Sequence, residues 1–115
     1  MIAKKAVAAL GALAQETRLA IYRALVEAGP DGLAAGRIAA KLAVAPSSLS
    51  FHLAQLAHAG LVTQRRVSRH LFYAADYTAM NGLMAYLTEN CCGGEACVPV
   101  CSPALATPRS RRKSA

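Results

Sequence analysis

Two short helical patterns separated by only three residues constrain this fold more than any other feature of the sequence. Residues 33–42 and 46–59 each place apolar side chains three or four positions apart, as on one face of a helix. Ala43-Val44-Ala45 separates the segments, and Pro46 is well suited to the first position of the second helix. The sequence therefore predicts a helix–turn–helix. The apolar positions of its second helix are Leu49, Leu53 and Leu56.

The segments around this motif extend it into a longer order of elements. Two further helical patterns precede it, and a third lies near the end of the periodic part of the chain. Between them, two runs rich in β-branched and aromatic residues flank Ser68-Arg69, which predicts a β-hairpin. The fold class expected is mainly α with a small β-hairpin, in the α-α-α-α-β-β-α order of a winged helix–turn–helix. The predicted helices cover residues 2–13, 16–28, 33–42, 46–59 and 77–90, and the predicted strands cover 61–67 and 70–75.

The composition changes abruptly after Asn90, where Cys, Gly, Pro and Ser replace the helical pattern. A chain of 115 residues has room for one domain. We expect residues 1–90 to form that domain, and residues 91–115 to form a cysteine-rich segment with a basic tail. Four of the thirteen Lys and Arg residues lie at 109–113, so the net charge of +7 falls to +3 over residues 1–108. The position of the charges, rather than their total, must identify the partner.

The sequence also indicates a compartment. No apolar stretch approaches the roughly 20 residues that span a bilayer, so we expect no membrane segment. The alanine-rich start could be read as a secretory signal, but it has helical spacing and runs directly into the pattern at Glu16–Ala28. All four cysteines lie between Cys91 and Cys101, which does not suit the distributed disulfide framework of a small secreted domain. We therefore expect a cytoplasmic protein whose thiols act as ligands or redox groups.

The helix over 46–59 has a small, polar face opposite its leucines. Small side chains let a helix enter the major groove of DNA, where hydroxyl groups can bond to base edges and an aromatic ring can meet thymine methyl groups. A basic hairpin tip can follow the phosphate backbone or enter the minor groove. Alternatively, the serines only cap the helix and the arginines form a solvated strand edge. The candidate DNA contacts are Ser47, Ser48, Ser50, Phe51 and Gln55 on the helix, and Arg65, Arg66, Arg69 and His70 on the hairpin.

Three segments resemble the ArsR-type family of arsenic- and metal-responsive winged-helix repressors: Glu16–Leu25, Ser47–Leu53 and His58–Val62. The resemblance covers about residues 5–90. It implies that the serines of the second helix and Phe51 read double-stranded operator DNA, with Phe51 replacing the polar or basic residue usual there. His52 falls on a family histidine at the core edge of the helix and joins the candidate contacts. The resemblance also implies a homodimer joined through the first and last helices.

Two effector sites known in this family are missing here. Its Cys-x-Cys site lies on the helix before the turn, but residues 33–38 contain no thiol. Its zinc-type site on the final helix needs His and carboxylate ligands, and residues 77–90 hold no His and only Glu89. The remaining thiols resemble the arrangement in members whose arsenic site follows the last helix. These candidate ligands are Cys91, Cys92, Cys97 and Cys101.

Trivalent arsenic prefers three thiolates, and soft sulfur ligands select such ions over hard ones. Gly93-Gly94 can reverse the chain so that Cys97 joins Cys91 and Cys92, with Cys101 as a fourth or an alternative ligand. The expected inducer is arsenite or methylarsenite, and antimonite is a further candidate. Zinc or cadmium, a disulfide redox switch and unliganded thiols are the alternatives.

These patterns predict an arsenite-responsive transcriptional repressor that binds an operator as a dimer and releases it when arsenic binds the thiols. The alternatives are a zinc-, cadmium- or redox-responsive winged-helix regulator, and a winged helix that binds a protein partner. We expect no enzyme, because the three histidines are scattered and the chain shows no nucleophile–base pairing or Gly-rich phosphate loop.

Overall fold

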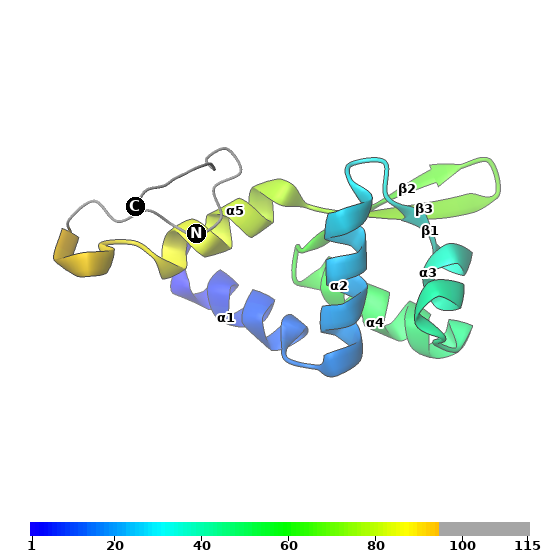
Figure 1. Ribbon diagram of the computed structural model, residues 1–115, viewed down its shortest axis with the longest axis horizontal. Helices are drawn as coiled ribbons and strands as arrows, with labels where there is room; N and C mark the ends of the chain where they lie inside the picture. Colours follow the sequence, from blue (N-terminus) through cyan, green and yellow to red (C-terminus); the bar gives the residue numbers. More distant parts are fainter. Residues whose placement is uncertain (95–115) are drawn as a thin grey trace, which may run out of the picture.

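The computed structural model describes residues 1–94 of the chain (Figure 1). Its helices are α1 (Ala3–Leu13), α2 (Glu16–Ala28), α3 (Ala35–Leu42), α4 (Pro46–His58) and α5 (Tyr77–Leu87), followed by the short 3₁₀ turn η1 (Cys91–Gly94). Its strands are β1 (Leu33–Ala34), β2 (Val62–Val67) and β3 (His70–Ala75). The predicted fold, mainly helical with a small antiparallel sheet, is confirmed. Across residues 1–94, no helix combines the length and the hydropathy needed to cross a membrane.

The turn between α3 and α4 depends on one left-handed residue. Ala43 takes φ 54° and ψ 47°, and the N–H groups of Ala43 and Val44 both donate to the Ala39 carbonyl oxygen. Extended Ala45 then leads into Pro46, whose ring suits the first turn of α4. The predicted helix–turn–helix is present with the predicted break between its helices.

The helix expected to begin at Leu33 begins instead at Ala35, because Leu33 and Ala34 form β1. β1 pairs antiparallel with β3, with Leu33 opposite Tyr73, so the strand order is β1-β3-β2. Gly32 permits this approach: its φ is 75°, and a Cβ at this position would overlap the Tyr73 carbonyl oxygen. The open edge of β3 supplies backbone hydrogen bonds that the local helical pattern does not reveal. The expected two-stranded hairpin is therefore part of a three-stranded sheet.

The helix predicted over residues 77–90 ends at Leu87. The Thr88 hydroxyl donates to the Met84 carbonyl oxygen at 2.9 Å, and Asn90 takes φ 58°. A hydroxyl that bonds to the helix backbone and an asparagine that tolerates the left-handed conformation together end the helix. The last three predicted helical residues form a turn that leads into η1.

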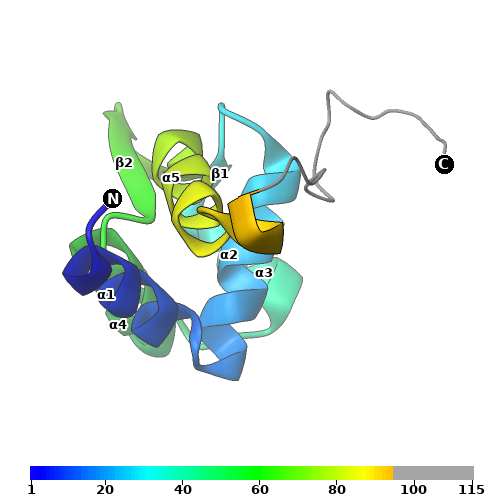
Figure 2. The same cartoon turned by 90° about the vertical axis from the view of Figure 1, so that its left-hand side faces the viewer.

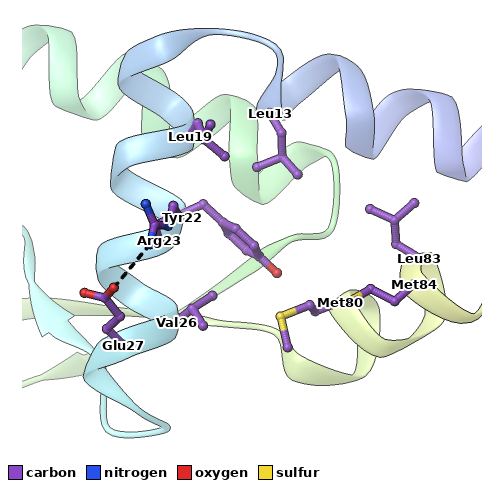
Figure 3. Close-up of a pocket in the computed structure, with 9 residues that line it drawn as sticks. All are labelled: Leu13, Leu19, Tyr22, Arg23, Val26, Glu27, Met80, Leu83 and Met84. Carbon is purple, nitrogen blue, oxygen red and sulfur yellow. Dashed lines mark ion pairs between the residues drawn. The ribbon is translucent and has the colours of Figure 1, made fainter. Parts of the chain in front are cut away.

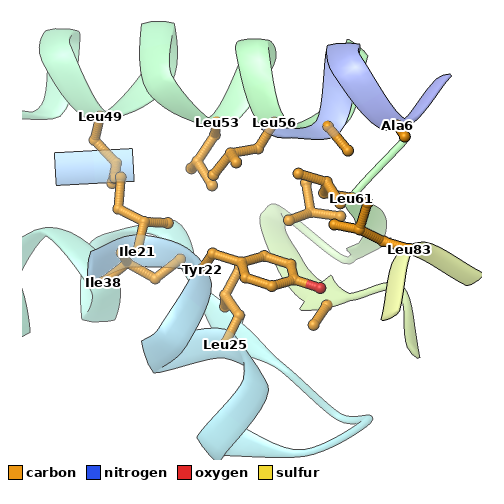
Figure 4. Packing of buried hydrophobic residues seen from close by; sticks show 13 residues of the cluster. Ala6, Ile21, Tyr22, Leu25, Ile38, Leu49, Leu53, Leu56, Leu61 and Leu83 are labelled. Atoms are coloured by element: carbon orange, nitrogen blue, oxygen red, sulfur yellow. The ribbon is translucent and has the colours of Figure 1, made fainter. Parts of the chain in front are cut away.

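The core lies where α2, α3 and α4 meet the base of the β2–β3 hairpin (Figure 4). By contrast, α1 contributes only Ala6 and Ala9 to the buried cluster, and α5 contributes Leu83. Fully burying a leucine or isoleucine side chain is worth roughly 1.5–3 kcal/mol, so this cluster fixes the helix–turn–helix. Its largest fully buried side chains are Ile21, Leu25, Ile38, Leu49, Leu53, Leu56 and Leu61.

The hairpin and the last helix lie at opposite ends of the molecule. Figure 1 shows β2 and β3 projecting at one end, and α1 and α5 side by side at the other. Figure 2, seen from that second end, shows η1 just beyond α5. We call α3, α4 and the β2–β3 hairpin the reading end, and α1, α5 and η1 the α1/α5 end.

Candidate nucleic-acid interface

α4 divides its side chains between the core and the solvent. Its leucines at 49, 53 and 56 are at most 2% exposed. Phe51, on the other side, is 58% exposed, which is uncommon for a large apolar ring. The structure therefore places the candidate side chains on the outer side of the helix. The other exposed candidates on α4 are Ser47, Ser48, Ser50 and Gln55.

The serines at the start of α4 do not cap it. The N-cap residue is Ala45, and no side chain accepts a hydrogen bond from the first amides. In the part of the chain that the structure describes, the hydroxyls of Ser47, Ser48 and Ser50 have no hydrogen-bond partner. The capping alternative is therefore wrong for these residues. The hydroxyls and the amides of the first turn stay available to a phosphate or a base edge.

His52 faces α2 rather than the outer side of α4. It is half-buried, and its Nδ1 lies 3.4 Å from Arg18 Nη1. Arg18 is itself held in place, because its Nε donates to the Ala12 carbonyl oxygen at 2.7 Å. The imidazole also meets Phe51 edge-on, with ring centroids 5.7 Å apart. His52 therefore joins α4 to α2 and supports the exposed Phe51.

β2 and β3 form the wing, and one of its arginines is held differently from the others. Arg65 Nη2 donates to the Asp31 carbonyl oxygen at 2.9 Å, and the guanidinium carbon lies 5.1 Å from the centroid of the Phe72 ring. The hydrogen bond ties the wing to the loop before β1, and the cation–π contact with Phe72 of β3 holds the guanidinium within the wing. Arg65 is thus a positioning residue in this structure. The exposed candidates that make no such contact within residues 1–94 are Arg66, Arg69 and His70.

The reading end has no negative side chain. Residues 32–75 contain five Lys and Arg residues and no Asp or Glu, which gives this segment a charge of +5. Two of the cations, Arg37 and Lys41, are exposed on α3 beside the turn. A region this uniformly basic attracts a polyanion and releases its counterions on binding. The electrostatics therefore agree with the geometry of α4 and the wing.

Cys91 and Cys92 lie in η1, beyond the end of α5. Cys91 is half-buried and Cys92 is exposed, and the Cys91 N–H donates to the Thr88 carbonyl oxygen at 3.0 Å. The backbone is left-handed at Cys92 (φ 57°) and at Gly93 (φ 68°). The expected reversal of the chain at the glycines thus begins one residue earlier. Because α5 ends at Leu87, a turn of three residues separates the thiols from the helix.

Cys97, Cys101 and the basic residues at 109–113 lie outside the described residues. Within residues 1–94, no three His, Cys, Asp or Glu side chains come together in a way that could hold a metal ion. The thiol cluster as a ligand set stays a prediction.

The α1/α5 end exposes large apolar side chains from both of its helices. Leu87 is 57% exposed and Val7 is 68% exposed, although both belong to amphipathic helices whose other sides are packed. Exposed apolar patches on small proteins commonly mark interaction sites. The other large apolar residues exposed on α1 and α5, or just before α1, are Met1, Ile2, Leu10 and Met84.

Comparisons with known proteins agree with this geometry. Residues 13–65 match a family model described as a helix-turn-helix domain. The chain is 34% identical over 88 residues to the transcriptional activator HlyU of Vibrio cholerae serotype O1. This alignment covers 76% of this chain and 79% of that protein. The solved structure of HlyU from Vibrio cholerae aligns with a TM-score of 0.60 and 36% identity, covering 73% of this chain and 91% of the other.

A second solved structure names the family. An ArsR-like transcriptional regulator from Rhodococcus sp. RHA1 aligns with a TM-score of 0.65 and 29% identity, over 76% of this chain and 78% of the other. The chain belongs to the ArsR family. The winged helix–turn–helix domain of Mb0332 from Mycobacterium bovis, 22% identical with a TM-score of 0.62, shares the fold over 74% of this chain and 77% of its own. As an ArsR-family protein, the chain is a DNA-binding transcriptional regulator and not an enzyme.

Proposed function

We propose that this ArsR-family regulator is a homodimeric repressor that releases its operator when trivalent arsenic binds its C-terminal thiols. The observation that carries the proposal is the place of Cys91 and Cys92, two adjacent thiols on a reversed turn that begins four residues after the end of α5. The same helix leaves Met84 and Leu87 exposed. An ion bound at the turn would therefore act on the end of a helix that has apolar surface for a second chain.

A homodimer through α1 and α5 is part of this proposal. Both helices expose large apolar side chains at the same end of the molecule, away from the wing. The Mycobacterium bovis domain of the same fold is described as homodimeric. In such a dimer the two copies of α4 would lie about 34 Å apart, one turn of DNA, and the operator would be nearly palindromic.

Within each copy, α4 would enter the major groove with its N-terminal half. Ser47 and Ser50 would bond to base edges or phosphates, and Phe51 would meet thymine methyl groups. Arg66 and Arg69 of the wing would contact the backbone or the minor groove. His52 and Arg65 would act mainly through position, since each is held by another element of the same chain.

The proposed arsenic ligands are Cys91, Cys92 and Cys97, with Cys101 as an alternative third ligand. Three soft thiolates suit a trivalent arsenic or antimony ion better than a hard cation. The left-handed backbone at Cys92 and Gly93 supports this, since it turns the chain back immediately after the first two thiols. Arsenite, methylarsenite and antimonite share this chemistry.

Arsenic binding would move the end of α5 and change the separation of the two reading ends in the dimer. Coupling between two such sites is typically about 1–3 kcal/mol, or roughly 5–150-fold in affinity. The coupling is reciprocal, so bound operator must weaken arsenic binding by the same factor.

Fluorescence anisotropy of a labelled operator duplex tests this function. Arsenite should lower operator affinity of the wild-type protein roughly 5–150-fold. The variant Cys91→Ser should bind the operator normally and keep it in arsenite, whereas Ala85→Ser, an added hydroxyl at an exposed position of α5, should release it as the wild type does. Release by the Cys91 variant would refute the arsenic site. Absence of any salt-sensitive duplex binding would refute DNA recognition by these residues.

A redox-responsive regulator is the second candidate function. One similar solved structure, described as reduced HlyU from Vibrio cholerae, favours it. A disulfide here would pair Cys97 or Cys101 with one of the η1 thiols, because adjacent cysteines are hard to join to each other. A thiol oxidant, zinc and cadmium belong beside arsenite in the same release titration. In vitro transcription measures the direction of regulation. A repressor lowers the amount of transcript when it occupies the operator, and an activator raises it. Oxidant-dependent release without arsenite-dependent release would replace the arsenic proposal with this one.

A further inference from the structure

An apolar pocket of about 380 Å³ lies between α2 and α5 (Figure 3). Its volume is within the range of small-molecule sites, at the small end. Arg23 and Glu27 lie at its edge, where their charged groups pair at 3.7 Å. The apolar side chains that line the pocket are Leu13, Leu19, Val26, Met80, Leu83 and Met84.

Tyr22 is the one polar side chain of this pocket that is buried. The residue is only 7% exposed, and its hydroxyl has no hydrogen-bond partner in the described part of the chain. Figure 3 shows the phenol ring extending from α2 toward Leu83 of α5. Buried hydroxyls nearly always have a partner, so this one needs an explanation.

We propose that this pocket binds a small, uncharged and mostly apolar molecule whose carbonyl oxygen accepts a hydrogen bond from the Tyr22 hydroxyl. The ligand would bury its hydrocarbon part against the leucines and methionines of the two helices. The proposal is separate from the arsenic site, because it uses no residue of η1.

The charges around Tyr22 explain why the ligand must be neutral. Burial raises the pKa of the Tyr22 phenol above its usual value, and the negative charge of Asp76 and the nearby Tyr77 raise it further. The hydroxyl therefore keeps its proton and acts as a donor at physiological pH. The same Asp76 carboxylate disfavours an anionic ligand at this place. A ketone, ester or amide oxygen satisfies both conditions.

The lining also explains how a ligand reaches a covered hydroxyl. Met80 and Met84 have unbranched, flexible side chains, which can change rotamer at little cost. Movement of these two residues would open the pocket from the α5 side without disturbing the packed core behind α2.

The test uses NMR of the full-length protein labelled with ¹³C at its methionine methyl groups. The chain has three methionines, and two of them line the pocket, while Met1 lies near Gly82 on another side of α5. Benzylacetone should shift the methyl signals of Met80 and Met84 in a saturable way and leave Met1 unchanged. Butylbenzene, which lacks the carbonyl, should bind about fivefold more weakly, because it loses one hydrogen bond.

Two variants separate the hydrogen bond from the cavity. Tyr22→Phe should weaken benzylacetone about fivefold and leave butylbenzene unchanged, whereas the matched Tyr86→Phe on α5 should change neither. Leu19→Trp, at an exposed edge of the pocket, should block both probes while keeping the native methyl spectrum of Met1.

Three results would overturn the proposal. The first is the absence of saturable shifts at Met80 and Met84 with either probe. The second is equal affinity for the ketone and the hydrocarbon. The third is that the two methyl signals change with protein concentration and not with ligand, which would show that a second copy of the chain fills the pocket.

Discussion

α4 and α5 have similar lengths, but the molecule uses them differently. α4 has 13 residues and buries three leucines to 2% exposure or less, so its inner side is complete within one chain. α5 has 11 residues, and Leu83 is its one buried residue, at 7% exposure, while Met84 and Leu87 remain 39% and 57% exposed. The reading helix is therefore fixed by its own domain, whereas the last helix has apolar surface left for a further contact.

The largest effect expected from this difference is on stability. Leu53→Ala should lower the free energy of unfolding by about 3 kcal/mol, because it leaves a cavity behind α4. Leu87→Ala should change it by less than about 1 kcal/mol in the monomer but should weaken dimer formation about tenfold. Chemical denaturation measures the first quantity and sedimentation equilibrium the second. If both variants lose the same stability and dimerise normally, the contrast between the helices is wrong.

The next effect concerns the strand that attaches the wing to the rest of the reading end. Gly32→Ala should destabilise the fold by at least about 2 kcal/mol, because its Cβ would meet the Tyr73 carbonyl and its φ is 75°. Gly29→Ala, with φ 89° and ψ −176° but open space around it, should cost only the backbone strain, about 1–3 kcal/mol, and less than Gly32→Ala. Thermal unfolding of the two variants gives this comparison. Equal losses would mean that the close approach of β1 to β3 contributes nothing.

A smaller effect separates two arginines of the wing. Arg66→Ala should lower operator affinity by about 1 kcal/mol and reduce the slope of log affinity against log salt by about 1, as expected for one phosphate contact. Arg65→Ala should change that slope less, because its guanidinium is already bonded to the Asp31 carbonyl and stacked on Phe72. Anisotropy titrations at several salt concentrations measure both slopes. Identical slope changes would show that Arg65 contacts phosphate directly.

The smallest effect is at the turn between α3 and α4. Ala43→Gly should change the free energy of unfolding by less than about 1 kcal/mol, with the sign favouring stability, because relief of the left-handed strain at φ 54° exceeds the added chain entropy. Operator affinity should stay unchanged, since the turn geometry is the same. Denaturant midpoints resolve a shift of this size. A clear loss of stability would mean that the Ala43 methyl group makes a needed contact.

Local patterns predicted most of the helical fold. The leucines of α4 repeat at helical spacing, and Ser50, Phe51 and Gln55 between them are exposed as their spacing predicted. The start of β1 and the end of α5 were not predicted correctly. β1 forms only because β3 presents an edge some forty positions later in the sequence, and α5 ends early because Thr88 bonds to its backbone. Neither interaction leaves a periodic signal.

The candidate interface divides in the same way. The sequence identified the exposed serines and Phe51, because an amphipathic helix must turn its polar side away from the core. It did not reveal that Arg65 is held by Asp31, which lies 34 positions away, or that His52 meets Arg18 across the same separation. Contacts between elements decide which basic side chains are held and which extend into solvent.

The helix–turn–helix, the hairpin and the basic character of the reading end follow from the order of residues, because helical spacing, turn residues and charge are local properties of a chain. The third strand, the anchoring of Arg65 and the pocket at Tyr22 arise only when the chain has folded. Each of these depends on contacts between two segments that are distant in the sequence, and the energy of those contacts cannot be deduced from either segment alone.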